Sequence, residues 1–389
     1  MTISKIKPEI IFTLVALFSV SFVASIFLMQ LVAAIIFLMW LFENWDHKKN
    51  IFNALTISVY IFGFARLISI IFSHYPELSY QAFYKEALFY LILPPLCFYL
   101  KDFGKEKLIG LIYIFILGAC FISLVGSIRF ISGFVERAQS FTSGYMVFSG
   151  YLLAALSLAL FVPKGTLNTK AQWYWSIILL VLFIGIILSL GRTNILIAAL
   201  VFIIAILLKK INIKQLLMIL FLGAAFVILL IIFPIPLVES RFENITQLSD
   251  RDIIWQGAIS ILFEHPVFGY GPRTFREIFP LLDMFADKGI GSWHNDFLQI
   301  YFDSGLLGLT AFIFLIITTI TVSLNQIRNK KIDADLRNLS ASILVAIISQ
   351  LLSSITSGFI TSAILSIVFV FFISMLYRIE VERKTLTSS

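Results

Sequence analysis

The sequence predicts an all-α polytopic membrane protein with about twelve transmembrane helices and one long external loop. Of its 389 residues, 60% are hydrophobic and only 13% are charged. The mean hydropathy is +0.98, and apolar runs repeatedly reach the roughly 20 residues that a helix needs to cross a bilayer. The first run, residues 10–41, is too long for the apolar region of a cleaved signal peptide. It is therefore expected to form two spans.

Twelve spans are expected in chain order: 10–26, 28–42, 51–73, 78–100, 108–134, 145–163, 173–190, 193–208, 215–236, 295–325, 338–357 and 360–377. The tenth is longer than a bilayer requires, so its start is expected to project from the membrane. A very tight turn around Ser357 and Gly358 is expected between the last two. The chain is thus divided into nine helices (1–236), a large external loop (237–293), three further helices (294–379) and a cytoplasmic tail (380–389).

The basic residues indicate how the chain is oriented. If the N-terminus is cytoplasmic, nearly every lysine falls in a cytoplasmic loop, as the positive-inside rule requires. The net charge of +7 and the pI of about 9.3 then reflect membrane topology, and no nucleic-acid partner is expected. Both termini are predicted to be cytoplasmic, while the external side receives few lysines and several arginines: Arg137, Arg192, Arg241, Arg251, Arg273 and Arg276.

These external arginines are typical of an anion site. A guanidinium group offers a planar fork of donors that matches phosphate oxygens. Arg192 follows Ser-Leu-Gly in a very short turn between two spans, so it is expected at the membrane surface or below it. Three further cations, Arg66, Lys85 and Arg129, fall within apolar runs. They have a structural alternative, which is snorkelling to the interface or, for Arg66, pairing with Glu86.

Within the external loop, Ser249 and Asp252 have the spacing of a capping box. The residues after them, up to Leu262, predict an amphipathic helix with Arg251 in its first turn. This helix is expected to lie on the membrane or to pack over the spans. A glycine-rich turn, residues 268–273, follows His265 and Pro266. It fits a helix terminator as well as a backbone site for an anion.

His294 is the candidate catalytic base because it stands where the polar loop meets a span. A neutral imidazole can accept a proton from a hydroxyl near pH 7. Asp296, Asn295 or an acid from another loop could orient it. Asp303, deeper in the same span, could support the site or serve as the partner of an intramembrane arginine. No metal site is expected, because no group of His or carboxylate residues has a ligand spacing, and the only cysteines, Cys97 and Cys120, lie in apolar runs.

The motif around His294 resembles the signature of the bacterial O-antigen ligase family, whose superfamily includes O-antigen polymerases. The motif is His294-Asn295, nine residues, Gly305, two residues, Gly308 and then Thr310. Two weaker elements are also similar to that family. They are Arg192-x3-Leu196 and, in the external loop, Arg251-x3-Trp255-x2-Ala258 followed by Pro266-x2-Gly269-x-Gly271. The chain departs from the usual pattern at Arg273, which leaves open whether this arginine joins the anion site.

The resemblance implies a GT-C-like glycosyltransferase of the bacterial inner membrane, with its active site facing the periplasm. Its donor would be a glycan linked to undecaprenyl diphosphate, its acceptor a sugar hydroxyl of lipid A-core, and it would need no nucleotide sugar, metal or other cofactor. His294 would be the base. Arg192 and Arg251 would hold the diphosphate, with Arg137 and Arg241 as helpers, and Asn295, Asp296, Arg273 and Asp303 as possible support.

Two alternatives to the ligase remain. An O-antigen polymerase would use the same donor with a second lipid-linked glycan as acceptor, although the His-Asn pair favours the ligase. A lipid-linked glycan transporter would also carry intramembrane charges. The sequence shows no internal repeat and no paired broken helices of the kind that many transporters contain.

Overall fold

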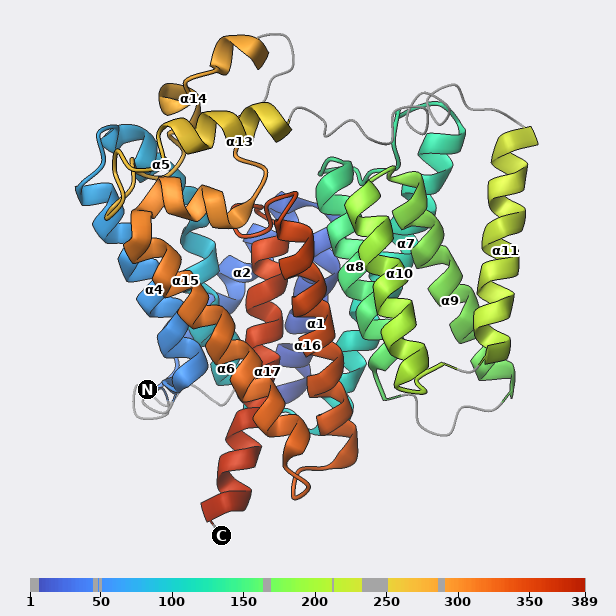
Figure 1. Ribbon diagram of the computed structural model, residues 1–389. Helices are drawn as coiled ribbons and strands as arrows, with labels where there is room; N and C mark the ends of the chain where they lie inside the picture. The colour runs from blue at the N-terminus through green and yellow to red at the C-terminus, as the bar shows by residue number, and fades with distance from the viewer. Residues whose placement is uncertain are drawn as a thin grey trace.

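The computed structural model describes residues 7–44, 48, 51–163, 169–211, 213–232, 251–285 and 291–388. The regular structure in these residues is helical, without a strand (Figure 1). Predictions for Arg241, and for Ser249 as part of a capping box, lie outside this part of the chain.

The helices follow one another as α1 (Pro8–Ala24), α2 (Ile26–Leu41), α4 (Ala54–Ile71), α5 (Pro76–Leu91), α6 (Leu93–Leu100), α7 (Lys105–Ile131), α8 (Tyr145–Phe161), α9 (Thr169–Leu188), α10 (Arg192–Leu207), α11 (Ile213–Ile232), α13 (Arg251–Ser260), α14 (Phe275–Ile278), the 3-10 helix η2 (Leu282–Phe285), α15 (Asp296–Arg328), α16 (Ala334–Ser354) and α17 (Leu365–Ser388). Each expected span corresponds to one of these helices, except that the fourth is divided into α5 and α6. That division lies beside Pro94 and Pro95, which occupy the first turn of α6.

Five helical segments of the described residues are long and apolar enough to cross a bilayer: Ala54–Ile71, Pro76–Leu100, Lys105–Ile131, Asp296–Arg328 and Ala334–Ser354. Several others are apolar but shorter, including α1, α2, α8 and α10. At a rise of 1.5 Å per residue, a helix of about 16 residues spans roughly 24 Å, somewhat less than the ~30 Å hydrocarbon core. The described part of the chain is therefore helical and includes segments with the length and composition of membrane spans, as expected of a polytopic membrane protein.

The last helix differs from its prediction at both ends. α17 begins at Leu365 and continues to Ser388, so most of the segment expected to be a tail is helical. Two ion pairs at helical spacing support the extension, Arg378 with Glu382 and Arg383 with Glu380.

The prediction of a very tight turn at Ser357 and Gly358 is wrong. α16 ends at Ser354, and ten residues, 355–364, separate it from α17. Backbone amides of this connection find acceptors outside helical hydrogen bonding, because the amides of Phe359 and Ile360 donate to the carboxylate of Asp296. The connection, called here the 355–364 loop, is thereby held open as a wall of the candidate site.

Gly305 breaks the overlong helix α15. Its backbone angles, φ 60° and ψ −161°, are not helical and belong to a region that side-chain-bearing residues rarely adopt. The first turns of α15, up to Ser304, consequently run in a different direction from the rest of the helix (Figure 1). Whether this start projects from the membrane, as expected, stays a prediction.

The break in α15 is filled by the glycine-rich turn of the external segment. The amides of Tyr270 and Gly271 donate to the carbonyl oxygens of Phe302 and Asp303, at 2.7 and 3.1 Å. In return, the amide of Leu306 donates to the carbonyl oxygen of Pro266 at 2.7 Å. Backbone groups released by the non-helical Gly305 are thus satisfied by another segment. This exchange gives the Pro266-x2-Gly269-x-Gly271 pattern a structural role.

Contacts between helices far apart in the sequence hold the region around the break in α15. α15 packs along α4, and α16 packs along α8. α13 and α14 lie at one end of the molecule, above the first turns of α15 (Figure 1). The buried face of α13 carries Ile254 and Ala258, which join an aromatic cluster with Phe275, Trp293 and Phe302. The expected amphipathic helix therefore packs over the spans, although Trp255 lies outside its buried face and is 44% exposed.

Candidate functional site

Trp293 anchors the segment that presents His294. Its side chain is only 1% exposed, and its ring stacks on Phe302 at a centroid distance of 4.0 Å. Phe275 and Phe279 meet the same ring edge-on. Such a cluster of aromatic rings is rigid and apolar, so it fixes the backbone immediately before the histidine.

His294 itself has a positive φ of 49°, which is unusual for a residue with a side chain. The strained backbone turns the chain from Trp293 into α15. Among the described residues, the imidazole of His294 makes no hydrogen bond, so both ring nitrogens remain available to a ligand. A strained backbone is common at functional sites, and here it occurs at a residue whose imidazole has no hydrogen-bond partner among the described residues.

Asn295 directly precedes α15, and its side chain hydrogen-bonds to groups other than the histidine. Its side-chain oxygen accepts hydrogen bonds from the amides of Phe297 and Leu298, which makes it the N-cap of the helix. Its side-chain nitrogen donates to the carbonyl oxygen of Ile355 at 3.1 Å. Asn295 therefore joins the start of α15 to the 355–364 loop.

Asp296 makes a second connection to the same loop. One carboxylate oxygen, Oδ2, accepts hydrogen bonds from the amides of Phe359 and Ile360, at 2.7 and 3.2 Å. The side chain is completely buried. Asn295 and Asp296 together hold the loop against His294, which places them in supporting positions.

A buried polar network lies behind Asp296. The side-chain nitrogen of Gln299 donates to Asp303 at 2.8 Å, and Arg66 on α4 approaches the other oxygen of Asp303 at 3.4 Å. Arg66 also forms a bidentate pair with Glu86 on α5. The pairing of Arg66 with Glu86, and the role of Asp303 as the partner of an intramembrane arginine, are thus present as the structural alternatives anticipated. The side-chain oxygen of Gln299 also accepts a hydrogen bond from the backbone amide of Trp293, which links this network to the segment before His294.

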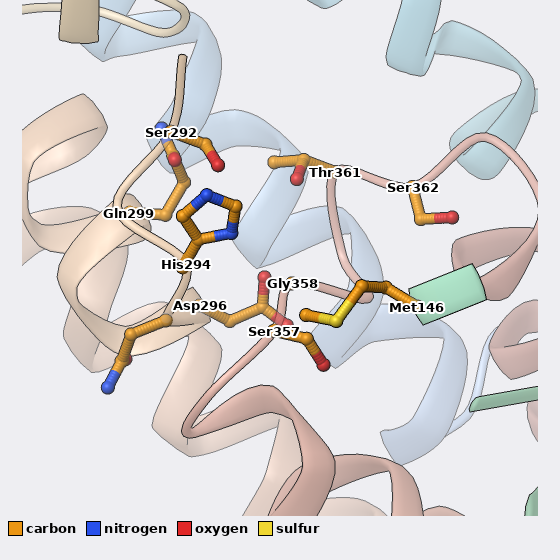
Figure 2. Close-up of a pocket in the computed structure, with 10 residues that line it drawn as sticks. Met146, Ser292, His294, Asp296, Gln299, Ser357, Gly358, Thr361 and Ser362 are labelled. Carbon is orange, nitrogen blue, oxygen red and sulfur yellow. The ribbon is translucent and has the colours of Figure 1, made fainter. Parts of the chain in front are cut away.

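These elements enclose a pocket of about 200 Å³. Figure 2 shows His294, Asp296 and Gln299 on one side of it and the 355–364 loop, with Ser357 and Thr361, on the other. Its lining is mostly polar: Met146, Ser292, His294, Asn295, Asp296, Gln299, Ser357, Gly358, Thr361 and Ser362.

The electrostatic surroundings favour a neutral histidine. Burial lowers the pKa of His294 below its ordinary value of 6.5, and the positive charge of Arg251 lowers it further. A neutral imidazole is the form that can accept a proton. At neutral pH the pocket therefore holds His294 in the form that can accept a proton.

Arg251 lies at the edge of this pocket. Its guanidinium donates a hydrogen bond of 2.7 Å to the carbonyl oxygen of Thr356, the residue before the pocket-lining Ser357. Burial lowers the pKa of Arg251, the nearby Tyr145 raises it, and the positive charge of Arg192 lowers it. The charge of Arg251 thus acts on His294, and the charge of Arg192 acts on Arg251, although Arg192 and His294 are 102 positions apart in the sequence.

Arg192 is the first residue of α10 and follows a connection of only three residues after α9. The preceding Leu190 has a φ of 54°, so the turn is sharp. Asn194, buried one turn into the helix, donates to Ser149 on α8 at 2.6 Å and accepts from Ser353 on α16 at 2.7 Å. These bonds fix the Arg192 turn beside the helices that lead into the pocket.

Of the two other predicted arginines that the structure describes, one lies near the pocket and one does not. Arg137 covers the ring of Tyr145, with its guanidinium carbon 4.1 Å from the ring centre, next to the pocket-lining Met146. Arg273 is exposed, has a φ of 66° and does not line the pocket. It belongs to the turn that pairs with the break in α15. The structure thus brings His294, Arg251, Arg192 and Arg137 to one region and leaves Arg273 outside it.

Several residues of the site were not anticipated from the sequence. Trp293 and Gln299 position the histidine, and Asn194 positions the Arg192 turn. Their sequence signals were a tryptophan directly before His294, an amide two residues after Arg192 and another amide five residues after His294. The 355–364 loop carried a weaker signal, its run of serine, threonine and glycine, which the expected tight turn obscured.

In chemical terms the pocket combines a neutral base, fixed hydroxyl and carboxylate groups, and two arginines near its edge. Within the described ranges, no group of three His, Cys, Asp or Glu residues could hold a metal ion. The fold and the pocket together define a helical membrane protein with a buried polar site at one end of its helices. Such a site suits group transfer from a donor with an anionic leaving group.

Residues 177–313, roughly a third of the chain, match the family described as O-antigen ligase. The match includes Arg192, Arg251 and His294. The match supports the family predicted from the motif around His294. The matched stretch supports, broadly, an activity of the O-antigen ligase or polymerase type. No curated protein matches the chain.

Proposed function

We propose that this protein is an O-antigen ligase that transfers a glycan from undecaprenyl diphosphate to a sugar hydroxyl of lipid A-core. The observation that carries the proposal is the position of His294. Its imidazole lines a polar pocket of about 200 Å³, lacks a hydrogen-bond partner among the described residues, and has a lowered pKa. A glycan transferase with a lipid-linked donor needs such a base for its acceptor.

The reaction forms one bond and breaks one bond. The acceptor hydroxyl attacks the anomeric carbon of the donor sugar while His294 takes its proton. The bond from that carbon to the diphosphate oxygen breaks, and undecaprenyl diphosphate leaves with the electron pair. A positioned base typically contributes about 10² to 10⁴ in rate. The remaining acceleration comes from positioning and from stabilisation of the leaving group.

Arg251 and Arg192 are proposed to bind the diphosphate. Both are only partly buried, and the positive charge of Arg192 lowers the pKa of Arg251, so two positive charges are concentrated beside one pocket. Such a concentration is electrostatically costly without an anion and favourable with one. Arg137, beside Tyr145, is proposed as a helper, and Arg241 as another that lies outside the described residues.

The membrane arrangement proposed for this function has twelve spans in a GT-C-like fold. The helices α1 to α11 and α15 to α17 provide the spans, with α5 and α6 counted together. Both termini lie in the cytoplasm of a bacterial inner membrane, and α13, α14 and the pocket face the periplasm. The distribution of lysines supports this orientation.

Reconstitution tests the activity. The full chain in liposomes is supplied with undecaprenyl-diphosphate glycan and lipid A-core, with and without EDTA. A single capped lipid A-core product, formed equally in EDTA, is expected for a ligase. A ladder of longer lipid-linked glycans would instead establish the polymerase, and movement of the donor between leaflets without bond formation would establish a transporter.

A further inference from the structure

The carboxylate of Asp296 is only half satisfied. Its Oδ2 atom accepts two backbone hydrogen bonds from the 355–364 loop. Its other oxygen, Oδ1, is buried and has no hydrogen-bond partner in the part of the chain that the structure describes. Oδ1 lies at the pocket, since a Cβ atom added to the pocket-lining Gly358 would be 3.0 Å from it.

An unpartnered carboxylate oxygen at the wall of a polar pocket requires a donor. Leaving a buried acceptor without a partner costs more than the hydrogen bond itself is worth, so native proteins rarely retain one without a function. Gly358 places no side chain beside Oδ1, where a Cβ atom would make a tight contact of 3.0 Å. The donor must therefore come from something that enters the pocket.

The chemistry of the lining identifies the donor. Ser357, Thr361 and Ser362 place hydroxyl-bearing side chains on the wall opposite His294 (Figure 2). Groups that both donate and accept hydrogen bonds suit a polyhydroxylated ligand. At about 200 Å³, the pocket is smaller than the ~300–1,000 Å³ typical of sites for drug-sized molecules, so it suits a group the size of one sugar ring.

We propose that Asp296 Oδ1 accepts a hydrogen bond from a second hydroxyl of the acceptor sugar, next to the hydroxyl that His294 deprotonates. This inference rests on the proposed function, because it names the acceptor half of the same site. Asp296 is then a specificity-determining residue. The protein selects a sugar that presents two neighbouring hydroxyls, one as nucleophile for His294 and one as anchor for Asp296.

The substitution Asp296→Asn separates anchoring from loop positioning. The asparagine carbonyl oxygen can still accept the hydrogen bonds of Phe359 and Ile360. Its amide nitrogen then replaces Oδ1 in the pocket, which changes an acceptor into a donor while the size of the side chain is unchanged. Asp252→Asn, at an exposed position of α13, is the matched control.

The test measures sugar binding and transfer separately. Purified full-length protein in nanodiscs, without donor, is titrated with the methyl glycoside of the acceptor hexose and with analogues that lack one hydroxyl at a time. Wild type and D252N are expected to lose about 10- to 100-fold in affinity for one deoxy analogue, the loss expected for a hydrogen bond to a charged group. D296N is expected to bind the parent hexoside that much more weakly and to be indifferent to the same deoxygenation.

Three results would overturn the proposal. They are wild-type affinity of D296N for the parent sugar, equal sensitivity of D296N and wild type to every deoxy analogue, or no saturable hexoside binding to the wild type. The first two would mean that Oδ1 holds only a structural water. The transfer assay keeps the two proposals distinct. Transfer with an unchanged acceptor KM in D296N refutes the anchor alone, whereas Asp296-dependent sugar binding without any transfer refutes the ligase alone.

Discussion

The guanidinium of Arg251 donates a hydrogen bond of 2.7 Å to the carbonyl oxygen of Thr356, and this contact joins α13 to the 355–364 loop. The same arginine lowers the pKa of His294. Arg251 therefore hydrogen-bonds to the wall of the pocket and also acts electrostatically on the candidate base. A ligand that binds Arg251 would change both its hydrogen bond to Thr356 and its effect on the pKa of His294.

Replacing Arg251 or Arg192 by lysine is expected to reduce turnover by at least about 10-fold. Lysine keeps the positive charge but loses the planar fork that binds a diphosphate bidentately. Turnover is measured in liposomes, with the amount of inserted protein determined in parallel. Arg276→Lys, at an exposed position of α14, is the control and should remain active. Full activity of both R192K and R251K would show that these arginines have a structural role only.

The pH dependence of the transfer rate should reflect the environment of His294. The neutral form is active, so kcat/KM for the acceptor rises with pH through the pKa of His294 and is flat above it. Because this pKa is lowered by burial and by Arg251, the acid limb should lie below pH 6.5, the ordinary value. Arg251→Gln removes one of the two causes and should move the limb upward, but not fully to 6.5, because burial remains.

A pH profile of wild type and R251Q decides this point. An acid limb at the same pH in both proteins would mean that Arg251 does not act on the base. A limb above pH 6.5 in the wild type would contradict the direction of the shift.

The substitution His294→Ala should lower turnover by about 10² to 10⁴, the usual contribution of a positioned base, without loss of donor binding. His294→Gln is the more informative change, because glutamine can hydrogen-bond to the acceptor but cannot take its proton at neutral pH. Turnover at saturating acceptor is compared for both variants. If H294Q retains nearly wild-type turnover, His294 only positions the sugar, and the base lies elsewhere.

The helical framework could be predicted from the sequence because long apolar runs indicate membrane helices. The pocket depends on contacts between residues far apart in the sequence, which hydrophobic periodicity does not predict. Asp296 binds amides 63 and 64 residues away, and Arg66 approaches Asp303 across 237 residues. Neither pairing has a local signal. The 355–364 loop shows the limit most clearly, since its polar residues resemble a turn until the carboxylate that holds it open is placed.

The residue types of the site were more predictable than their partners. A histidine at the edge of a span and arginines on the side that lysines avoid stand out because their positions are energetically unusual. Which arginine reaches the pocket could not be decided in this way. Arg251 and Arg273 belong to the same external segment, but α13 directs one toward Thr356, and the turn at Gly271 places the other on an exposed surface.

Membrane orientation can be tested by cysteine labelling. Both native cysteines, Cys97 and Cys120, are buried within helices, so they give little background. A cysteine at the exposed Arg273 should react with a membrane-impermeant reagent added from the periplasm, and one at the exposed Lys330 should not. The reverse pattern would place the pocket on the cytoplasmic face, where a lipid A-core acceptor exposed to the periplasm could not reach it.

The break at Gly305 makes the last prediction, because it joins α15 to the glycine-rich turn. A Cβ atom at this position would lie 2.2 Å from the carbonyl carbon of Val267, and φ is +60°. Gly133 offers a matched comparison, since its φ is +74° with nothing within 4 Å of an added Cβ. Alanine at Gly133 bears only the backbone cost of a positive φ, about 1 to 2 kcal/mol. Alanine at Gly305 must also displace a backbone segment.

G305A is therefore expected to be destabilised by more than G133A, by at least about 3 kcal/mol, and to lose transfer activity as the 266–271 segment is pushed from α15. Thermal unfolding of the purified proteins in one detergent measures the first effect, and the liposome assay measures the second. G133A should remain active. If the two variants unfold at the same temperature, the hydrogen bonds between the 266–271 segment and α15 do not hold the external segment in place, and the spacing from His294 to Gly305 needs another explanation.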